Sequence, residues 1–171
     1  TLMRKADISD YVVFAKEILK EIRMKPVSFE VFADEYDEME RQALRIASWG
    51  RNVYVKIPVM NTKGVLSLDL IQKLSNEGVQ LNITAVMTIE QVSKISDSVQ
   101  GGAPCFVSVF AGRIADTGID PIPFMQKALE LLKKSSNAEL LWASPREVLN
   151  VYQAEDIGCH IITATKEILN K

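Results

Sequence analysis

The sequence of 171 residues predicts an α/β fold, in which parallel β-strands form a barrel that helices cover. Three observations support this prediction. Strand-like and helix-like segments alternate along the chain, which is typical of a parallel sheet built from βα units. The strand-like segments have one wholly apolar face and one face with polar residues. No linker or low-complexity segment interrupts the pattern, so we expect residues 1–171 to form a single domain.

Six segments are predicted to be strands because they are short, apolar and bounded by turn residues. They cover residues 27–33, 53–59, 79–86, 105–110, 139–144 and 160–163. Amphipathic patterns predict helices over residues 8–22, 35–49, 64–77, 88–98, 121–134 and 145–156, and a further helix after the last strand. Asp120-Pro121 and Ser144-Pro145 resemble helix starts, because proline suits the first helical position.

The two faces of each strand can be separated because side chains alternate with a period of two. From the first to the fifth strand, the polar face carries Ser28, Glu30 and Phe32; Tyr54, Lys56 and Pro58; Asn82 and Thr84; Phe106, Ser108 and Phe110; and Trp142 and Ser144. This pattern is typical of a (β/α)8 TIM barrel, whose outer face packs on helices and whose inner face carries chemistry at the C-terminal rim. A doubly wound open sheet would be apolar on both faces, so the barrel is favoured.

Six strands are two fewer than a complete barrel of this kind contains. A helical pattern precedes the first strand, and the sequence stops in the helix that follows the sixth. We therefore expect two N-terminal strands and some C-terminal helix to be absent from this sequence. The domain would then cover roughly the third to the eighth strand. The alternative is an open six-stranded sheet that folds alone.

Composition and charge exclude several classes of function. The 20 basic and 22 acidic side chains give a net charge of −2 without a basic block, so no nucleic-acid partner is expected. No apolar run reaches about 18 residues, so no membrane partner is expected either. Cys105 and Cys159 lie in apolar strand-like runs, which favours buried thiols over a disulfide. His160 is the only histidine, so neither a histidine-based metal site nor a catalytic triad is expected.

Lys56 is the most informative residue because it interrupts the apolar run of residues 53–59. Lysine is rarely buried unless it is paired, and desolvation disfavours its charged form. A neutral lysine amine can attack a carbonyl carbon and form a Schiff base. The alternative is a lysine whose stem lies along apolar surface while its ammonium group reaches water.

Several motifs around the predicted strands occur in one order along nearly the whole chain. Val-Ser-Phe-Glu-Val spans residues 27–31, and Val-Lys-Ile-Pro spans residues 55–58. They are followed by Gly-Val-Gln-Leu-Asn-Ile-Thr-Ala at 78–85, Ser-Val-Phe-Ala-Gly-Arg-Ile-Ala-Asp at 108–116, Ala-Ser-Pro-Arg at 143–146 and Ala-Glu-Asp-Ile-Gly-Cys at 154–159. In these motifs and their separations the chain resembles the transaldolase family, which includes short bacterial and archaeal members and the related fructose-6-phosphate aldolases.

The resemblance implies a catalytic role for three of the matching residues. Lys56 would be the Schiff-base lysine that attacks the ketose carbonyl. Glu30 and Thr84 would position the catalytic water that moves protons while the imine forms and breaks. The chemistry is consistent with these roles, because a protonated imine is the electron sink that a retro-aldol step needs. A buried carboxylate can supply the required acid–base help through one water molecule.

The resemblance also implies a set of substrate-binding residues. Asn82 and Ser108 would hydrogen-bond the hydroxyls of the three-carbon unit, and Phe110 would line the pocket beside the imine. The phosphate would be held by Arg113, Ser144 and Arg146. Arginine suits this task because its planar donor fork matches a phosphate group.

Glu30 and Phe110 favour a transaldolase, because fructose-6-phosphate aldolases tend to have Gln and Tyr at these positions. The implied reaction moves a dihydroxyacetone unit from sedoheptulose 7-phosphate or fructose 6-phosphate to an aldose phosphate, erythrose 4-phosphate or glyceraldehyde 3-phosphate. The resemblance implies sugar phosphate substrates, a place in the pentose phosphate pathway, a cytoplasmic homo-oligomer, and neither a metal nor an organic cofactor.

Two other functions stay open. One is a Schiff-base aldolase that releases free dihydroxyacetone to water. The other is an inactive truncated barrel, because the family's acid–base aspartate on the first strand and substrate-binding asparagine on the second are not in this sequence.

Structural roles are the alternatives for the individual residues. Glu30 could form a structural ion pair with Lys56. The polar side chains of the third strand could be satisfied by hydrogen bonds within the sheet. Arg113 and Arg146 could be surface cations that pair with carboxylates. Arg146 lies in the first turn of a predicted helix, where the helix dipole disfavours a cation, and this placement favours an anion beside it.

Overall fold

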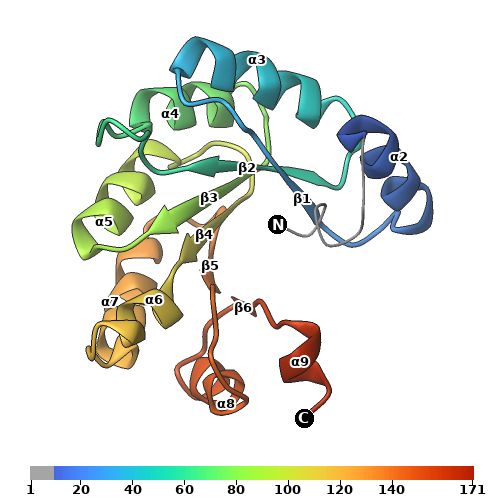
Figure 1. The fold of residues 1–171 in the computed structure, drawn as a ribbon. Helices are drawn as coiled ribbons and strands as arrows, with labels where there is room; N and C mark the ends of the chain where they lie inside the picture. Colours follow the sequence, from blue (N-terminus) through green and yellow to red (C-terminus); the bar gives the residue numbers. More distant parts are fainter. Residues whose placement is uncertain (1–9) are drawn as a thin grey trace.

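The computed structural model describes residues 10–171. In that part of the chain, six parallel strands form one sheet, and each strand pairs with the next along the sequence. The sheet curls into half a barrel, and helices cover its convex face (Figure 1). This arrangement confirms the predicted α/β fold, because sequential parallel pairing with helices on the outside is how a (β/α)8 barrel is built.

All six predicted strands are present, and each is shorter than its sequence pattern. They are β1 (Val27–Glu30), β2 (Val53–Pro58), β3 (Leu81–Val86), β4 (Cys105–Val109), β5 (Ala138–Trp142) and β6 (Ile161–Ile162). The pairing of β1 with β2 places Glu30 directly beside Lys56, and the pairing of β2 with β3 places Lys56 beside Asn82. The sheet therefore brings three predicted site residues into one row.

The helices alternate with the strands as predicted. They are α2 (Tyr11–Glu21), α3 (Tyr36–Ala47), α4 (Leu68–Asn76), α5 (Ile89–Ser98), α6 (Ala111–Asp116), α7 (Pro121–Leu132), α8 (Leu149–Asp156) and α9 (Lys166–Leu169). The predicted helix over residues 8–22 is confirmed from Tyr11, and residues 8 and 9 lie outside the described residues. Helix α6 is absent from the prediction, because its six residues follow β4 directly and are too few to show a helical period.

The predicted start of α4 is wrong, because the helix begins at Leu68 rather than at residue 64. Gly64 has a φ of +77°, which belongs to a turn and not to a helix. An antiparallel bridge between Met60 and Leu66 closes this turn. The chain therefore reverses once between β2 and α4 before the helix can begin.

Of the two helix starts predicted from proline, one is confirmed and one is wrong. Asp120 caps α7 by accepting a hydrogen bond from a main-chain N–H of its first turn. Helix α8 begins at Leu149 and not at residue 145, because Asn150 accepts the main-chain N–H of Arg146 at 2.7 Å and stabilises a turn there. Arg146 therefore precedes α8, and the helix-dipole argument made for its placement does not apply.

The apolar side chains form two separate clusters on the two faces of the sheet. The larger lies between the convex face and the helices and contains the buried strand residues Val55, Ile57, Ile83 and Val107. The smaller lies on the concave face and consists of Tyr54, Phe106, Leu141 and Ala143, with Phe110 and Ile161 packed against it. The rings of Tyr54 and Phe106 stack with centroids 4.1 Å apart. The concave face is thus apolar around its polar row.

The predicted inner face of the fifth strand is wrong. Trp142 is fully buried in the larger cluster, whereas Leu141 and Ala143 belong to the concave cluster. The prediction counted back from Ser144 with a period of two. Ser144 lies beyond β5 and has a φ of +60°, so the alternation does not extend to it. Ser144 still lines the concave cavity, through this local change of direction.

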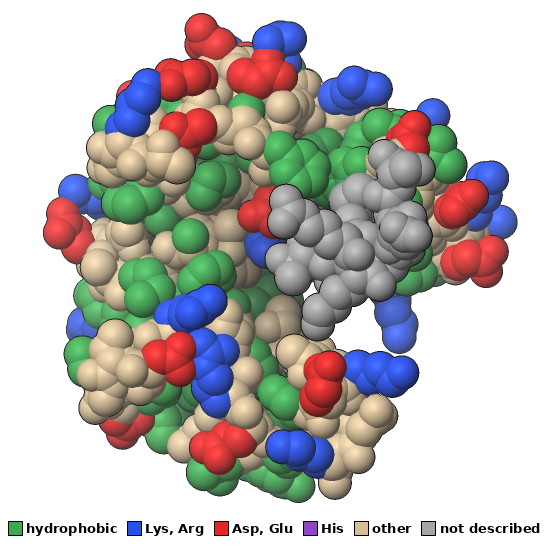
Figure 2. All heavy atoms as spheres, viewed as in Figure 1, with side chains coloured by type: hydrophobic (Ala, Val, Ile, Leu, Met, Phe, Trp, Pro, Cys, Tyr) green, Lys and Arg blue, Asp and Glu red, His purple; other side chains and the backbone are tan. Residues whose placement is uncertain are grey.

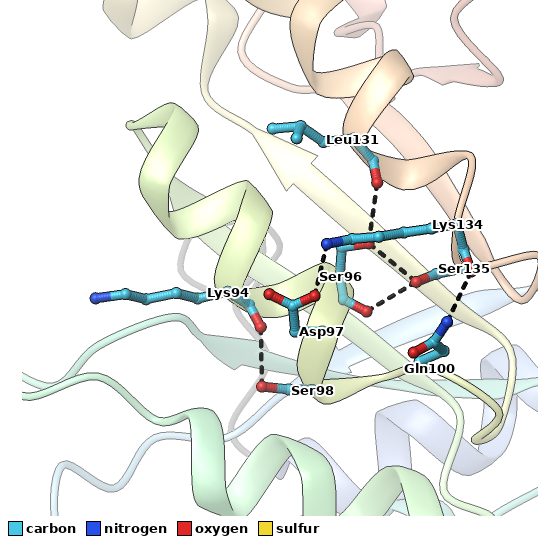
Figure 3. A network of polar contacts seen from close by, with 8 residues as sticks. All are labelled: Lys94, Ser96, Asp97, Ser98, Gln100, Leu131, Lys134 and Ser135. Carbon is cyan, nitrogen blue, oxygen red and sulfur yellow. Dashed lines mark hydrogen bonds and ion pairs between the residues drawn. The ribbon is translucent and has the colours of Figure 1, made fainter.

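Two buried serines join α5 to the chain that follows α7 (Figure 3). The hydroxyl of Ser135 donates to the carbonyl oxygen of Ser96 at 2.7 Å, and the two hydroxyl oxygens lie 2.9 Å apart. The hydroxyl of Ser96 also donates to the carbonyl oxygen of Leu131 at 3.1 Å. We call Ser96 and Ser135 the α5–α7 clamp. Both hydroxyls of this clamp have partners, and α5 and α7 lie on the convex side of the sheet, away from its concave face (Figure 1).

None of the helices in residues 10–171 has the length and apolarity that a membrane crossing requires.

Candidate active site

A cavity of about 640 Å³ opens on the concave face of the sheet. Its walls come from side chains on several strands and from the segments that follow β4, β5 and β6. Of the predicted site residues, those that line it are Lys56, Asn82, Thr84, Ser108, Phe110 and Ser144. Sequence positions more than eighty residues apart therefore meet in one concave site, as the predicted barrel requires.

Lys56 and Glu30 face each other at the end of the polar row. The Lys56 Nζ lies 3.7 Å from the Glu30 Oε2, and the two side chains are 32% and 49% exposed. Strand β2 is buried as predicted, but Lys56 itself keeps contact with solvent because it points into the open concave face. The pair is an ion pair rather than a direct hydrogen bond, for which 3.7 Å is too long.

Tyr11 of α2 holds the main chain of Glu30, a contact that sequence patterns did not indicate. The Tyr11 hydroxyl accepts the main-chain N–H of Glu30 at 2.9 Å and donates to its carbonyl oxygen at 3.4 Å. Burial raises the pKa of Tyr11, and the negative charge of Glu30 raises it further, against the opposing effect of the main-chain hydrogen bond. The neutral hydroxyl can therefore act as donor and acceptor at once.

A chain of hydrogen bonds crosses the floor of the cavity. The Ser108 hydroxyl donates to the Asn82 Oδ1 at 2.6 Å, and the Asn82 Nδ2 donates to the Ser28 hydroxyl at 2.9 Å. Asn82 and Ser108 are almost fully buried. Ser28 was placed on the polar face by its parity but received no role, and the structure adds it to the cavity wall.

Thr84 is the exception in this polar floor. Its hydroxyl is buried and has no hydrogen-bond partner among the described residues. A buried hydroxyl without a partner costs stability and is uncommon in folded proteins. Since Thr84 lines the cavity next to Asn82 on the same strand face, its free hydroxyl is available to a molecule that enters the cavity.

The predicted phosphate-binding residues lie around the turn between β5 and α8. Arg113 is exposed on α6, and Arg146 forms an ion pair with Asp116 of the same helix, with 2.8 Å between the Arg146 Nε and the Asp116 Oδ1. Hydrogen bonding from Arg146 lowers the pKa of Asp116, and the same contact raises the pKa of Arg146. Figure 2 shows basic and acidic side chains gathered between α6 and α8. Neither arginine lines the cavity itself, and Arg146 has the carboxylate partner that the structural alternative proposed.

The remaining candidate groups lie away from the concave face. Cys105 and Cys159 are free thiols as predicted, but only Cys105 is fully buried, and its burial raises its pKa to about 12. His160 accepts the main-chain N–H of Leu140 through its Nδ1 at 3.0 Å. It also borders a second cavity of about 430 Å³ beside α7, which contains none of the predicted site residues. Within residues 10–171, no group of three or more acidic, histidine or cysteine side chains is arranged to hold a metal ion.

Comparison with known proteins identifies similar sequences over almost the whole chain. Residues 6–171 match the sequence model of the family described as "Transaldolase/Fructose-6-phosphate aldolase". A "Probable transaldolase" from Dehalococcoides mccartyi is 35% identical over 170 residues, which cover 99% of this chain and 75% of that protein. A "Probable transaldolase" from Thermoanaerobacter is 30% identical over 161 residues, or 94% of this chain and 70% of that protein. A third, from Streptococcus equi subsp. equi, is 33% identical over 163 residues, or 95% and 72%.

Proposed function

Because the chain belongs to the transaldolase/fructose-6-phosphate aldolase family, we propose that it is a Schiff-base transaldolase. It would transfer a dihydroxyacetone unit from sedoheptulose 7-phosphate or fructose 6-phosphate to an aldose phosphate. In this proposal the chain forms one domain that covers roughly the third to the eighth strand of the barrel. The observation that supports it most is the position of Lys56, whose amine meets a carboxylate at 3.7 Å in a cavity with an unpartnered threonine hydroxyl.

The first step would be imine formation on Lys56. Its amine attacks the C2 carbonyl carbon of the ketose, and the carbonyl oxygen then leaves as water. One proton must pass from the nitrogen to the oxygen, and a second must reach that oxygen from an acid, so that water leaves and a protonated imine remains. Glu30 is the carboxylate paired with Lys56, and at 3.7 Å the two groups share no direct hydrogen bond, so a water molecule bound to both would carry the proton. The free hydroxyl of Thr84 would give that water a third partner.

The second step would break the bond between C3 and C4 of the ketose. The C4 hydroxyl gives its proton to a base, the electrons of the C3–C4 bond move into the protonated imine, and the aldose phosphate leaves an enamine on Lys56. The family resemblance assigns that base to the first-strand aspartate, which is not in this sequence. Attack of this enamine on the aldehyde of the acceptor reverses the sequence. Asn82 and Ser108, already joined at 2.6 Å, would orient the hydroxyls of the bound three-carbon unit.

The apolar part of the cavity supports transfer over hydrolysis. Phe110 packs with Phe106 and Leu141 on the concave face beside the polar row. Exclusion of water around the enamine would favour its reaction with the acceptor aldehyde. The phosphate of donor and acceptor would bind near Arg113, Ser144 and Arg146, where basic side chains gather at the edge of the site. The homo-oligomeric state stays a prediction from the family resemblance.

A two-arm assay tests this proposal. With fructose 6-phosphate and erythrose 4-phosphate, we expect sedoheptulose 7-phosphate and glyceraldehyde 3-phosphate to form in equal amounts, and Lys56→Met to form neither. With fructose 6-phosphate alone, we expect only slow release of dihydroxyacetone. Equally fast release without the acceptor would replace the transaldolase with the aldolase alternative. A folded protein without product in either arm would support the inactive barrel.

A further inference from the structure

The turn between β5 and α8 contains a strained residue at the edge of the cavity. Ser144 has a φ of +60°, in the left-handed region that residues other than glycine rarely adopt. Ser144 lines the cavity, just past the C-terminal end of β5. Strain of this kind persists only where the surrounding structure imposes it, so the contacts around Ser144 identify the groups that maintain this conformation.

Helix α6 holds the Ser144 carbonyl group on one side. The main-chain N–H of Gly112 donates to the carbonyl oxygen of Ala143 at 3.3 Å. A Cβ atom at residue 112 would lie 1.6 Å from the Ser144 carbonyl oxygen, so only glycine allows this approach. The N-terminal end of α6 is thus packed directly on the main chain of the turn.

Arg146 holds the same carbonyl group on the other side, and Asp116 holds Arg146. The Arg146 Nη1 donates to the Ser144 carbonyl oxygen at 2.9 Å. The Asp116 carboxylate accepts from the Nε at 2.8 Å and from the Nη2 of the same guanidinium group. Three of the five N–H donors of Arg146 are therefore occupied inside the protein, and its charge is balanced by a carboxylate.

We propose that Asp116 is a positioning residue for the phosphate end of the site, because it fixes Arg146 against the Ser144 carbonyl and so maintains the strained turn. The proposal rests on the proposed function, which supplies the phosphate group to be bound. Arg146 then acts mainly through the turn. Arg113, which lies on α6 with Asp116, forms no ion pair among the described residues and provides the remaining positive charge, although it also lowers the pKa of Asp116.

A competing account makes the opposite prediction. If Arg146 bound phosphate directly, the Asp116 carboxylate would compete with phosphate for the same donors. Removing the charge of Asp116 would then strengthen phosphate binding, whereas the positioning role requires that it weakens it. The sign of the effect therefore decides between the two accounts.

Titration of the protein with inorganic phosphate measures whether Asp116→Asn weakens or strengthens phosphate binding, and it requires no reaction at Lys56. We expect Asp116→Asn to raise the half-saturating phosphate concentration about tenfold, the effect of losing one charge-assisted hydrogen bond. Asp97→Asn is the matched control, because it breaks an exposed aspartate–lysine ion pair between α5 and α7. It should leave phosphate binding unchanged. Unchanged or tighter binding in Asp116→Asn, or no phosphate binding by the unaltered protein, would overturn the proposal.

Arg146→Lys keeps the positive charge but loses the planar fork that contacts Asp116 and Ser144 together. We expect it to weaken phosphate binding as Asp116→Asn does, and the double variant to be no weaker than either alone, because the two residues act as one unit. Fully additive effects would show that the residues act separately and would contradict the positioning role.

Trapping of imines with borohydride separates this inference from the proposed function. Asp116→Asn should trap dihydroxyacetone, which lacks phosphate, at the same concentration as the unaltered protein, and fructose 6-phosphate only at higher concentration. If Asp116→Asn raised the concentration needed for trapping equally for both ketones, Asp116 would maintain the whole site and not its phosphate end alone. If the unaltered protein traps neither ketone, the proposed chemistry fails, while the phosphate titration still tests Asp116.

Discussion

The α5–α7 clamp and the concave cavity both bury polar side chains, but they treat them differently. In the clamp each serine hydroxyl has partners, at 2.7 to 3.1 Å. In the cavity the Thr84 hydroxyl has none among the described residues, and Lys56 and Glu30 stay partly exposed, with their charged atoms 3.7 Å apart. A satisfied network stabilises a fold, whereas unsatisfied groups that face a cavity cost stability and are retained for another reason. The two regions should therefore separate stability from activity.

The largest expected effect is that of Lys56→Met, which removes the amine and keeps most of the side-chain volume. We expect transfer activity to fall by roughly 10⁴-fold or more, because the nucleophile carries the covalent chemistry. The free energy of unfolding should change by less than about 1 kcal/mol, because the ion pair with Glu30 is partly exposed. Chemical denaturation beside the coupled assay measures both. Residual activity above about one tenth would contradict the role of Lys56.

Thr84→Val comes next and tests the unpartnered hydroxyl. Valine has nearly the same shape, so it removes the hydroxyl without opening space. We expect activity to fall about 100-fold, the usual size of an acid–base contribution, while the free energy of unfolding stays constant or rises by about 1 kcal/mol. A loss of stability without a loss of activity would show that Thr84 belongs with the structural network.

Ser135→Ala is the matching change in the α5–α7 clamp. It leaves the buried carbonyl oxygen of Ser96 without its donor, so we expect a loss of about 1–3 kcal/mol in the free energy of unfolding. Activity below the unfolding transition should be unchanged. Reduced activity in the folded variant would mean that the two regions are not independent.

The smallest expected effect is a pH dependence at the edge of the cavity. Arg146 lowers the pKa of Asp116 below its ordinary value in the folded protein. The stabilisation is therefore complete above the unfolded pKa of about 4 and is lost as the pH falls through the lower folded pKa. The loss of free energy of unfolding caused by Asp116→Asn should be smaller at pH 3 than at pH 7. The loss caused by Ser135→Ala should be the same at both pH values. Urea denaturation at both pH values measures these losses. An equal loss for Asp116→Asn at pH 7 and pH 3 would contradict a stabilising ion pair between Asp116 and Arg146.

Strand order and most of the polar row were predictable because each depends on local periodicity. Alternation of period two placed Glu30, Lys56, Asn82 and Ser108 on the concave side, and parallel pairing then brings the polar row together. The roles of the site residues, by contrast, stay predictions that came from the family resemblance and that the geometry supports without testing.

The parts that sequence patterns did not predict depend on contacts made after the chain folds. The positive φ of Ser144 is imposed by its neighbours on α6 and Arg146, so counting along the strand placed Trp142 on the wrong face. The late start of α8 depends on a side chain that reaches back to the preceding turn. Tyr11 meets Glu30 only because α2 packs beside β1, and no spacing in the sequence records that contact.

The most direct test of the central claim is to incubate the protein with fructose 6-phosphate, reduce it with borohydride and map the adduct by peptide mass spectrometry. Lys25 is the natural internal control, because it lines the same cavity. We predict a single adduct on Lys56, absent from Lys56→Ala. An adduct on Lys25, or none on a protein shown to be folded, would contradict the claim that Lys56 is the Schiff-base lysine of this cavity.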